Sequence, residues 1–289
     1  MHTFDIGAVS VTRIPHFENL PLRPAALLPG TGPDLWEANR AWLAPDHWDP
    51  VSGRVRISVH SWLLRSGGRT ILIDTGLAPD PGREGVPVGA DLPAALAAAD
   101  VAPGDIDLVV CTHLHADHVG WNTREDDGEH VPFFPRAQYL FSAPDLAFFD
   151  PETLVEEPGR SAVVHARSVE PVLRSGQALI WDDHCLIDEN LRLDPAPGHT
   201  PGHGVLALES EGERALFVGD LLHTPVQILA PDASSCFCHD PSAAARTRRR
   251  ILERAADTAA LVLPAHFCGP GALEIGRDGT RFTVRRWAA

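Results

Sequence analysis

The chain has 289 residues, and its 24 basic and 39 acidic side chains give a formal net charge of −15. An acidic balance of this size argues against a nucleic-acid partner, which needs a basic face, and against electrostatic docking on anionic lipid. The length and an apolar content of 44% suit a globular protein of one large domain or two small ones.

The sequence predicts a cytoplasmic protein. Met1 to Asp5 show neither the basic region nor the apolar run of a secretory signal. No apolar stretch reaches the roughly 18 residues that a membrane-spanning helix needs. The five cysteines lack the spacing of a disulfide framework, which suits a reducing compartment. Cys236-Phe237-Cys238 is too tightly spaced for a zinc-finger pair, and we interpret it as structural or incidental.

The N-terminal region divides into two parts. Residues 1–12 are predicted to form an edge strand. Residues 13–50 are rich in Pro and Leu, carry Trp36, Trp42 and Trp48, and show little periodicity. Long irregular segments in compact domains are often lids or binding loops. We therefore expect residues 13–50 to be a packing arm, a lid, or both.

The first regular unit begins at Arg54. Alternation of apolar and polar residues over 55–63 predicts a half-buried strand, and Gly67-Gly68 is a turn signal before a second strand that ends at Asp74. Residues 91–99 are predicted to form a short helix. Pro103-Gly104 then precedes a strand over 106–111, which leads into a histidine-rich segment.

A second unit repeats this order. Residues 205–209 and 214–218 predict a hairpin that ends at Asp220. A helix follows, with Asp240 as N-cap and Pro241 at its first position, to about Ala256. A strand over 261–263 then leads to His266. We expect one domain, residues 1–289, made of two similar halves, with two sheets face to face and helices outside.

The connection between the halves, residues 138–178, is expected to be largely helical. Ser142-Ala143-Pro144-Asp145 resembles a capping box at the start of its first helix.

The segment Thr112 to His118 holds three imidazoles and a carboxylate within six residues. These are ligands for zinc, iron or manganese. His113 and His115 lie two apart, so on an extended segment their rings face the same side. Asp117 and His118 follow on a predicted turn into a helix and can address a second point nearby. Two metals need more than four ligands, and the second half offers further donors at strand ends: His199, Asp220 and His266.

This set of residues resembles the metal motifs of the metallo-β-lactamase-fold hydrolase superfamily, from about Val55 to the C-terminus. The resemblance implies a four-layer αββα sandwich in the α/β class, with the metals at one edge of the sheets. It implies one metal on His113, His115 and His199, a second on Asp117, His118 and His266, and Asp220 bridging the two. Asp74 resembles the family's second-shell aspartate, which orients a ligand imidazole.

His223 lies three residues after Asp220. In the acyl-homoserine lactonase branch a tyrosine typically stands there, but the one tyrosine of this chain, Tyr139, lies elsewhere. The pattern around His223, with Gln227 and the helix of Arg246 and Arg248, looks more like the branch of methyl parathion hydrolase. We expect His223 to face the substrate or to support a ligand. His60 is expected to be exposed or hydrogen-bonded, and His203 to shape its turn.

The expected mechanism is metal-assisted hydrolysis. Two divalent ions, zinc first, with manganese, iron or cobalt as alternatives, would generate a bridging hydroxide and polarise the substrate. Asp117, Asp220 and His223 are the candidate catalytic residues, with Asp117 or His223 relaying a proton. An apolar pocket favours hydrophobic esters, lactones or aryl phosphotriesters. Its candidate walls are Trp121, Phe133, Phe134, Phe267 and Trp42.

Several other functions stay open at this point: an acyl-homoserine lactonase, a glyoxalase II-like thioesterase, a mono-iron persulfide dioxygenase and a non-catalytic ligand-binding module. A processing ribonuclease would need a basic arm that this acidic chain does not show. The expected partner is a small hydrophobic molecule, and a homodimer is expected from base rates.

Overall fold

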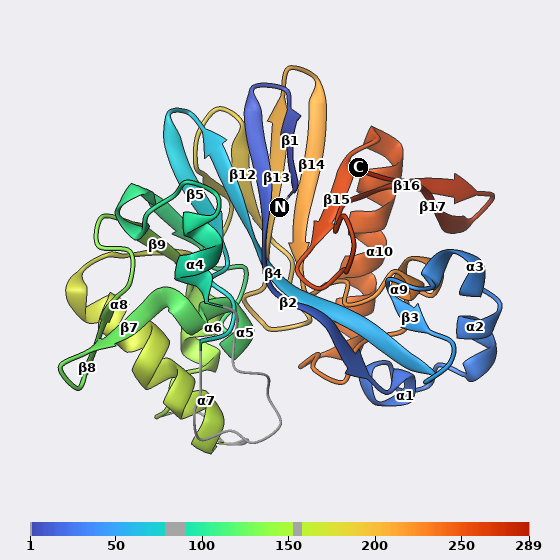
Figure 1. Cartoon of the computed structure of the whole chain (residues 1–289), viewed down its shortest axis with the longest axis horizontal. Helices are drawn as coiled ribbons and strands as arrows, with labels where there is room; N and C mark the ends of the chain where they lie inside the picture. The colour runs from blue at the N-terminus through green and yellow to red at the C-terminus, as the bar shows by residue number, and fades with distance from the viewer. Residues whose placement is uncertain (1, 79–90, 153–157, 289) are drawn as a thin grey trace.

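The computed structural model describes residues 2–78, 91–152 and 158–288. Two large β-sheets stand face to face at the centre, with helices on their outer sides (Figure 1). In that view α4, α6, α7 and α8 lie to the left of the sheets and α10 lies to the right. The predicted four-layer αββα sandwich is therefore confirmed.

The first sheet has the order β1-β2-β4-β5-β6-β9-β10, and β3 pairs with β4 outside this path. Its central pairs are antiparallel β4–β5 and parallel β5–β6. The strands are β1 (His2–Ile6), β2 (Val9–Leu22), β3 (Trp48–Asp49), β4 (Arg54–Ser66), β5 (Arg69–Ile73), β6 (Leu108–Val110), β9 (Gln138–Ser142) and β10 (Ala178–Trp181).

The second sheet runs β11-β12-β13-β14-β15-β16-β17 and repeats the same local pattern. Here β13–β14 is antiparallel and β14–β15 is parallel, as in β4–β5–β6. The predicted repeat of hairpin, carboxylate, helix and strand is thus present in the topology. The strands are β11 (Cys185–Leu186), β12 (Leu191–Pro195), β13 (Gly204–Ser210), β14 (Glu213–Gly219), β15 (Leu261–Pro264), β16 (Leu273–Asp278) and β17 (Arg281–Trp287).

Shorter elements complete the fold. A separate ribbon pairs β7 (Thr123–Asp126) with β8 (Glu129–Pro132). The α-helices are α1 (Pro24–Leu27), α2 (Pro33–Glu37), α3 (Arg40–Leu43), α4 (Leu92–Ala97), α5 (Ala116–Val119), α6 (Ala143–Phe148), α7 (Pro158–Val164), α8 (Glu170–Ser175), α9 (Val226–Leu229) and α10 (Pro241–Thr258). Short 3-10 turns cover Pro103–Asp105 and Gly120–Asn122, and a π-helical turn covers His165–Val169.

Buried apolar side chains fill each gap between the layers. Trp62 and Phe217 meet between the two sheets, with ring centroids 6.0 Å apart. Phe141 belongs to the cluster between the first sheet and its helices, and Leu252 of α10 belongs to the cluster on the second sheet. This burial leaves the strand ends, where the polar loops begin, as the region available for a site.

The N-terminal region is more regular than its sequence predicts. Residues 2–22 form the β1–β2 hairpin, so strand β2 extends well beyond the expected boundary at residue 12. Residues 24–43 form three short helices, whose Trp36 packs with Trp48 in a cluster of its own. Strand β4 is buried on both faces from Ile57 to Leu64, because Trp62 and Leu64 pack toward the second sheet and Leu63 packs in the cluster under the helices. The expectation of a half-buried strand was wrong.

The connection between the halves also differs. Its first residues, Gln138–Ser142, form β9 and pair with β6, so they are not helical. The predicted capping box is absent because Ser142 makes no side-chain cap bond. By contrast, α10 begins as predicted, with the Asp240 side chain accepting a hydrogen bond from the Ala243 N–H.

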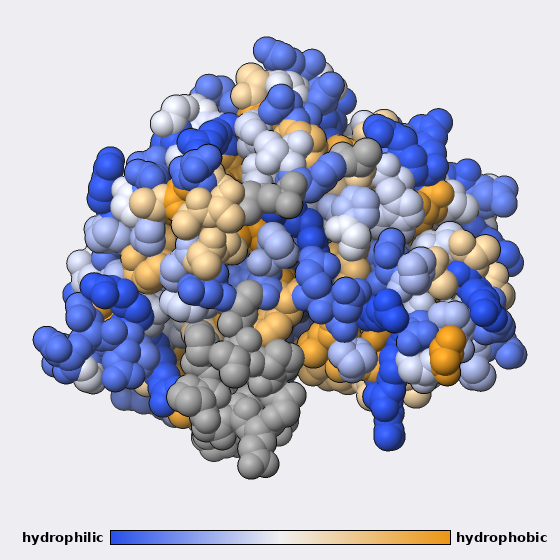
Figure 2. Space-filling view, viewed as in Figure 1, coloured by the Kyte–Doolittle hydropathy of each residue, from blue (hydrophilic) through white to orange (hydrophobic). Residues whose placement is uncertain are grey.

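Hydrophilic side chains cover most of the face in Figure 2, with hydrophobic patches between them. Among the described helices, none has the length and apolar content to cross a bilayer.

Candidate metal centre

Three loops bring polar side chains to one edge of the two sheets. The loop after β6 carries His113 and His115, and leads directly into the one-turn helix α5. The loop between β12 and β13 carries His199. Asp220 follows the last residue of β14, and His266 lies two residues after the end of β15. The parallel pairs β5–β6 and β14–β15 place these strand ends at a common edge, as the sequence predicts.

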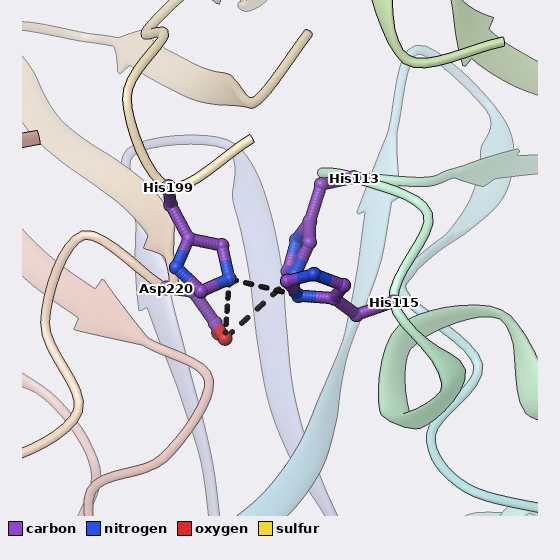
Figure 3. Close-up of side chains that lie close together, drawn as sticks. All are labelled: His113, His115, His199 and Asp220. Atoms are coloured by element: carbon purple, nitrogen blue, oxygen red, sulfur yellow. Dashed lines mark hydrogen bonds and ion pairs between the residues drawn. The ribbon is translucent and has the colours of Figure 1, made fainter. Parts of the chain in front are cut away.

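The first donor group comprises His113, His115, His199 and Asp220, whose donor atoms all lie within 4.8 Å of one another. In Figure 3 these side chains converge on one point from both halves of the chain. The distances are 3.0 Å from His113 Nε2 to His115 Nδ1 and 2.9 Å from His199 Nε2 to His115 Nδ1. Asp220 Oδ2 lies 3.2 Å from His199 Nε2.

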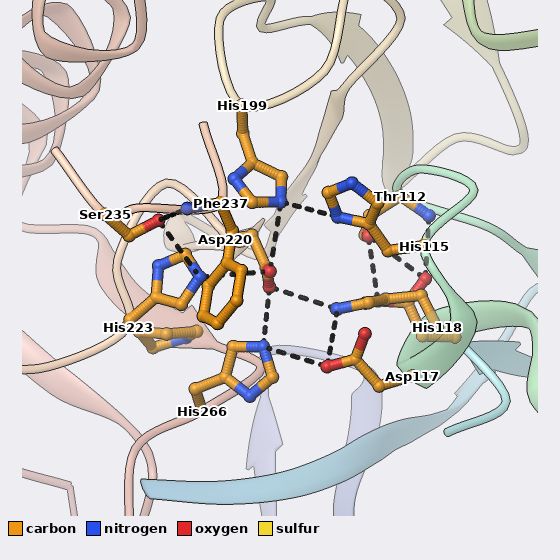
Figure 4. Close-up of polar contacts among 12 residues, drawn as sticks. Thr112, His115, Asp117, His118, His199, Asp220, His223, Ser235, Phe237 and His266 are labelled. Atoms are coloured by element: carbon orange, nitrogen blue, oxygen red, sulfur yellow. Dashed lines mark hydrogen bonds and ion pairs between the residues drawn. The ribbon is translucent and has the colours of Figure 1, made fainter. Parts of the chain in front are cut away.

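The second donor group comprises Asp117, His118 and His266, with donor atoms again within 4.8 Å. The other oxygen of Asp220 joins this group: Oδ1 lies 3.1 Å from His118 Nε2 and 2.9 Å from His266 Nε2. Asp117 Oδ2 is 3.8 Å from His118 Nε2 and 3.7 Å from His266 Nε2 (Figure 4). Asp220 therefore lies between the two groups, where the family resemblance implies a bridging carboxylate.

The atoms in these groups fit cations better than they fit one another. A neutral imidazole has one lone pair, and two such nitrogens at 3.0 Å repel unless one carries the proton. His118 Nε2 and Asp220 Oδ1 are buried and lie 3.1 Å apart, but neither makes a hydrogen bond of suitable geometry. Buried polar atoms without partners are rare and call for an explanation. Imidazole nitrogens and carboxylate oxygens are ligands for zinc and related divalent ions, which would satisfy these atoms.

Burial decides the charge of the first group. It lowers the pKa of His115 to about 4 and lowers the pKa of His113 and of His199 well below the usual histidine value. Burial opposes the charged form of Asp220 too, but the neighbouring imidazoles, His118 first, hold the pKa of this carboxyl well below its usual range. The group therefore offers neutral imidazoles and an ionised carboxylate, the protonation states that metal binding requires.

The ring nitrogens that face away from the centre are held by other groups. His118 Nδ1 lies 2.8 Å from Asp74 Oδ2, and His266 Nδ1 lies 2.8 Å from the Ser58 carbonyl oxygen. Asp74 also accepts hydrogen bonds from the N–H and the hydroxyl of Thr112. Such outer partners fix the orientation of a ligand imidazole. Asp74 thus contacts a candidate ligand imidazole, as the family resemblance implies.

Two further contacts behind the centre are absent from the sequence prediction. Cys238 Sγ lies 3.6 Å from His199 Nδ1, so the Cys236-Phe237-Cys238 segment contacts the centre. Arg13 is buried and donates to the carbonyl of Phe267, the residue after His266. Its guanidinium also contacts Ser58 and His60, and His60 is therefore a buried, hydrogen-bonded residue. Both contacts join positions far apart in the chain, which leaves no local sequence signal.

His203 is buried and contacts the backbone behind the centre. Its Nε2 accepts a hydrogen bond of 3.1 Å from the Asp220 N–H, and this bond fixes the backbone of Asp220.

His223 lies against Asp220 inside the centre. His223 Nε2 is 3.2 Å from Asp220 Oδ2, and its ring stacks on that of His266 with centroids 5.1 Å apart. Gln227 Oε1 accepts from the His223 N–H and fixes this turn. On the other side Phe237, which is 52% exposed, stacks on His223 at 5.9 Å (Figure 4). Phe237 is therefore an apolar side chain at the mouth of the centre, and the sequence did not point to it.

The aromatic residues predicted as pocket walls belong to hydrophobic clusters, and two of them are fully buried. Phe267 is fully buried in the cluster on the second sheet, and Phe134 is fully buried beneath the first sheet. Trp121 and Phe133 pack on each other at 5.4 Å in that same first cluster. Trp42 packs in the N-terminal cluster and donates its indole N–H to Asn39. The core takes up Phe134 and Phe267 because the burial of apolar area is favourable, whereas Trp42, Trp121 and Phe133 are only partly buried.

Comparison with known proteins supports the same conclusion as the geometry. The family model described as "Metallo-beta-lactamase superfamily" matches residues 54–266. "Probable metallo-hydrolase YybB" of Bacillus subtilis is 27% identical over 177 residues, which cover 61% of this chain and 68% of that protein. "N-acyl homoserine lactonase AiiB" of Rhizobium rhizogenes is 26% identical over 251 residues, 79% of this chain and 86% of that protein.

A solved structure is similar over the whole length. The dizinc quorum-quenching lactonase AidC, in complex with a product, superposes with a TM-score of 0.82 and 19% sequence identity. The superposition covers 100% of this chain and 97% of AidC. At this identity the likeness shows the common fold.

Proposed function

Because the chain belongs to the metallo-beta-lactamase superfamily, we propose that it is a dinuclear metal-dependent hydrolase of hydrophobic esters and lactones. The observation that carries the proposal is the position of Asp220, whose two oxygens each face a different donor group. A carboxylate shared in this way suits two ions held close together. Divalent ions bound there would supply Lewis acidity, which makes water nucleophilic at neutral pH and polarises a carbonyl oxygen.

The side chains around the donor groups have separate roles in this proposal. The Asp117 side chain is 34% exposed, against 4% for Asp220, so Asp117 is the carboxylate that an incoming substrate and water reach. Asp117 accepts the proton of the attacking water. Asp117 then returns this proton to the leaving oxygen, while His223, whose Nε2 faces the same centre from the opposite side, holds the substrate oxygen.

The substrate class rests on the surroundings of the centre. Phe237 presents an exposed aromatic ring beside His223, which suits an apolar acyl or aryl group. The net charge of −15 disfavours a nucleic-acid substrate, so we propose a small molecule. The similarity to the lactonase AiiB supports lactones, acyl-homoserine lactones among them, as substrates. Aryl phosphotriesters are the second candidate class, because the same centre would polarise a phosphoryl oxygen.

The test is a substrate panel on protein of measured metal content. The panel holds p-nitrophenyl esters, dihydrocoumarin, acyl-homoserine lactones, thioesters and paraoxon. We expect turnover of esters or lactones by protein with two divalent ions per chain, loss of turnover after chelation, and recovery with zinc, manganese or cobalt. One iron per chain with oxygen-dependent turnover would establish a dioxygenase instead. No turnover on any substrate with both ions bound would indicate a binding module.

Replacement of His115 by alanine tests the donor assignment. His115 Nδ1 lies within 3.0 Å of both His113 Nε2 and His199 Nε2, so the His115→Ala variant loses the central donor of the first group. We expect hydrolysis to be abolished and one metal ion per chain to be lost, as measured by turnover and elemental analysis. Wild-type turnover in this variant would show that the assignment is wrong.

A further inference from the structure

Asp145 is a buried carboxylate outside both donor groups. It lies in the first turn of α6, and its residue is completely shielded from solvent. A carboxylate at this position usually caps its own helix. Here the side chain instead reaches across to the loops that carry the candidate metal ligands.

Three hydrogen bonds end on this carboxylate. The Leu114 N–H donates to Oδ2 at 3.2 Å, and the Thr200 hydroxyl donates to Oδ2 at 2.9 Å. The Gly202 N–H donates to Oδ1 at 2.6 Å. Leu114 lies between His113 and His115, and Thr200 directly follows His199. One side chain thus binds the ligand segment of the first half and the ligand segment of the second half.

The surroundings are built closely around this contact. A Cβ atom at Gly202 would lie 2.5 Å from the Asp145 nitrogen and 2.8 Å from its Oδ1, so the loop can approach only with glycine there. In the part of the chain that the structure describes, no Lys or Arg forms an ion pair with Asp145. A buried carboxylate is costly unless hydrogen bonds satisfy it. All three of its hydrogen bonds come from the two ligand segments, so the buried carboxylate holds these segments in a fixed position relative to each other.

We propose that Asp145 is a positioning residue that sets the metal affinity of the three-histidine group, His113, His115 and His199. It does so by fixing Leu114 and Thr200 in place, and with them the ring positions of the adjacent ligands. The inference rests on the proposed function to the extent that these histidines bind a metal. Asp74 is the corresponding carboxylate for the second donor group, because it contacts the ligand His118 directly.

The test measures zinc affinity by competition with a chelator, without any substrate. Outer-shell substitutions typically weaken metal binding 10–100-fold. Asp145→Asn puts an amide where two N–H groups donate. We expect it to weaken the binding of one of two zinc ions about 10–100-fold and to leave the affinity for the other unchanged. Asp74→Asn is expected to weaken the other ion. Asp183→Asn, whose side chain is 86% exposed, is the control with both affinities unchanged.

A second background assigns the weakened ion to its group. In His266→Ala, where the three-histidine group remains complete, adding Asp145→Asn should weaken the remaining zinc ion. In the His115→Ala background, adding Asp145→Asn should leave the affinity for the remaining zinc ion unchanged. Thr200→Val keeps the shape of the side chain and removes one donor, so it tests the same contact should Asp145→Asn fail to fold, with a smaller loss at the same group.

Two results would overturn the inference: wild-type zinc affinity in both Asp145→Asn and Thr200→Val, or an equal loss at both metal ions, which would indicate general damage to the fold. The outcome is separable from that of the substrate panel. A selective loss of zinc in a protein that hydrolyses none of the panel would support this inference and contradict the proposed function.

Discussion

At the scale of single residues, three of the candidate ligand imidazoles are held by three different kinds of group. A carboxylate holds His118, a backbone carbonyl holds His266, and a thiol lies behind His199. These partners differ in how strongly they accept a proton, and an outer partner raises the basicity of the ligand in proportion. The two metal positions therefore differ in donor strength as well as in donor type.

His223 can be separated from the ligands by experiment. We expect His223→Gln to keep two metal ions per chain and to lower kcat about 100-fold, the usual contribution of a positioned acid or base. The physical reason is that each donor group, with one oxygen of Asp220, has four members without His223. His223 Nε2 lies 3.2 Å from Asp220 Oδ2 and could also form a group with Asp220 and His266. Steady-state kinetics and elemental analysis give both quantities. Loss of one metal ion would identify His223 as a ligand, and an unchanged kcat would leave it with no role in turnover.

The sequence predicts the donor residues of the candidate centre because their chemistry is local. Asp117 and His266 have side chains that bind metals and lie just after predicted strands, so residue type and position together indicate metal binding. It misses the residues behind them, since Arg13, Asp145 and Cys238 contact segments that lie 31 or more positions away in the chain. No pattern within a window of the sequence reports such contacts. It also does not distinguish an apolar residue that lines a site from one that belongs to the core, such as Phe267 beside His266.

At the scale of elements, α5 packs directly on the segment after β5. The Gly120 N–H donates to the Gly76 carbonyl at 2.8 Å, and the Thr75 N–H donates to the His118 carbonyl at 2.7 Å. A Cβ at Gly120 would lie 2.2 Å from the Ala78 nitrogen. This helix carries Asp117 and His118, so its seating on the chain after β5 positions two candidate ligands.

Gly120→Ala is therefore expected to lower the free energy of unfolding by about 1–3 kcal/mol, the range for overpacking in a close contact. The zinc ion of the second donor group should also bind more weakly. Gly104→Ala is the matched control, because a Cβ there meets no atom within 4 Å. Urea unfolding and chelator competition measure the two effects. Equal stability of Gly120→Ala and Gly104→Ala would contradict the packing argument.

Elements that are set by neighbouring residues in the sequence form as predicted, and elements that depend on pairing with distant segments do not. Asp240 and Pro241 start α10 where the sequence places its start, because a cap and a first-turn proline act within one turn. Gln138–Ser142 forms a strand because it pairs with β6, which no local pattern reveals. The capping-box prediction at Ser142 failed because Asp145 has donors in two distant loops.

At the scale of the whole molecule, His47 connects the N-terminal region with the second sheet. Its ring stacks on Trp287 of β17 with centroids 4.7 Å apart, and its Nδ1 is buried without a partner. Burial, with a smaller effect of Arg13, lowers the pKa of His47 to about 4. The folded protein therefore resists protonation that the unfolded chain accepts near its ordinary pKa of 6.5. Stability from this residue is present above that pH and is lost as the pH falls toward 4.

Because the pKa of His47 is lowered to about 4, we expect the free energy of unfolding of wild-type protein to fall by roughly 2 kcal/mol through this residue when the pH falls from 7 to 5. His47→Phe keeps a ring against Trp287 and removes the titrating group. The variant should therefore lose less stability than wild type over this range, by the same roughly 2 kcal/mol. Urea unfolding at the two pH values gives the comparison. Equal acid sensitivity in the two proteins would contradict this account.

The pairing of β2 with β4 has a consequence for any shortened version of the chain. The matched family region begins at residue 54, the first residue of β4, whereas β2 and Arg13 precede it. A chain trimmed to that boundary would leave the 13 residues of β4 with a free edge. Long, flat, apolar edges add strands from other molecules. Trimming to the family boundary would therefore yield an aggregating protein, and would remove the guanidinium that holds the loop of His266.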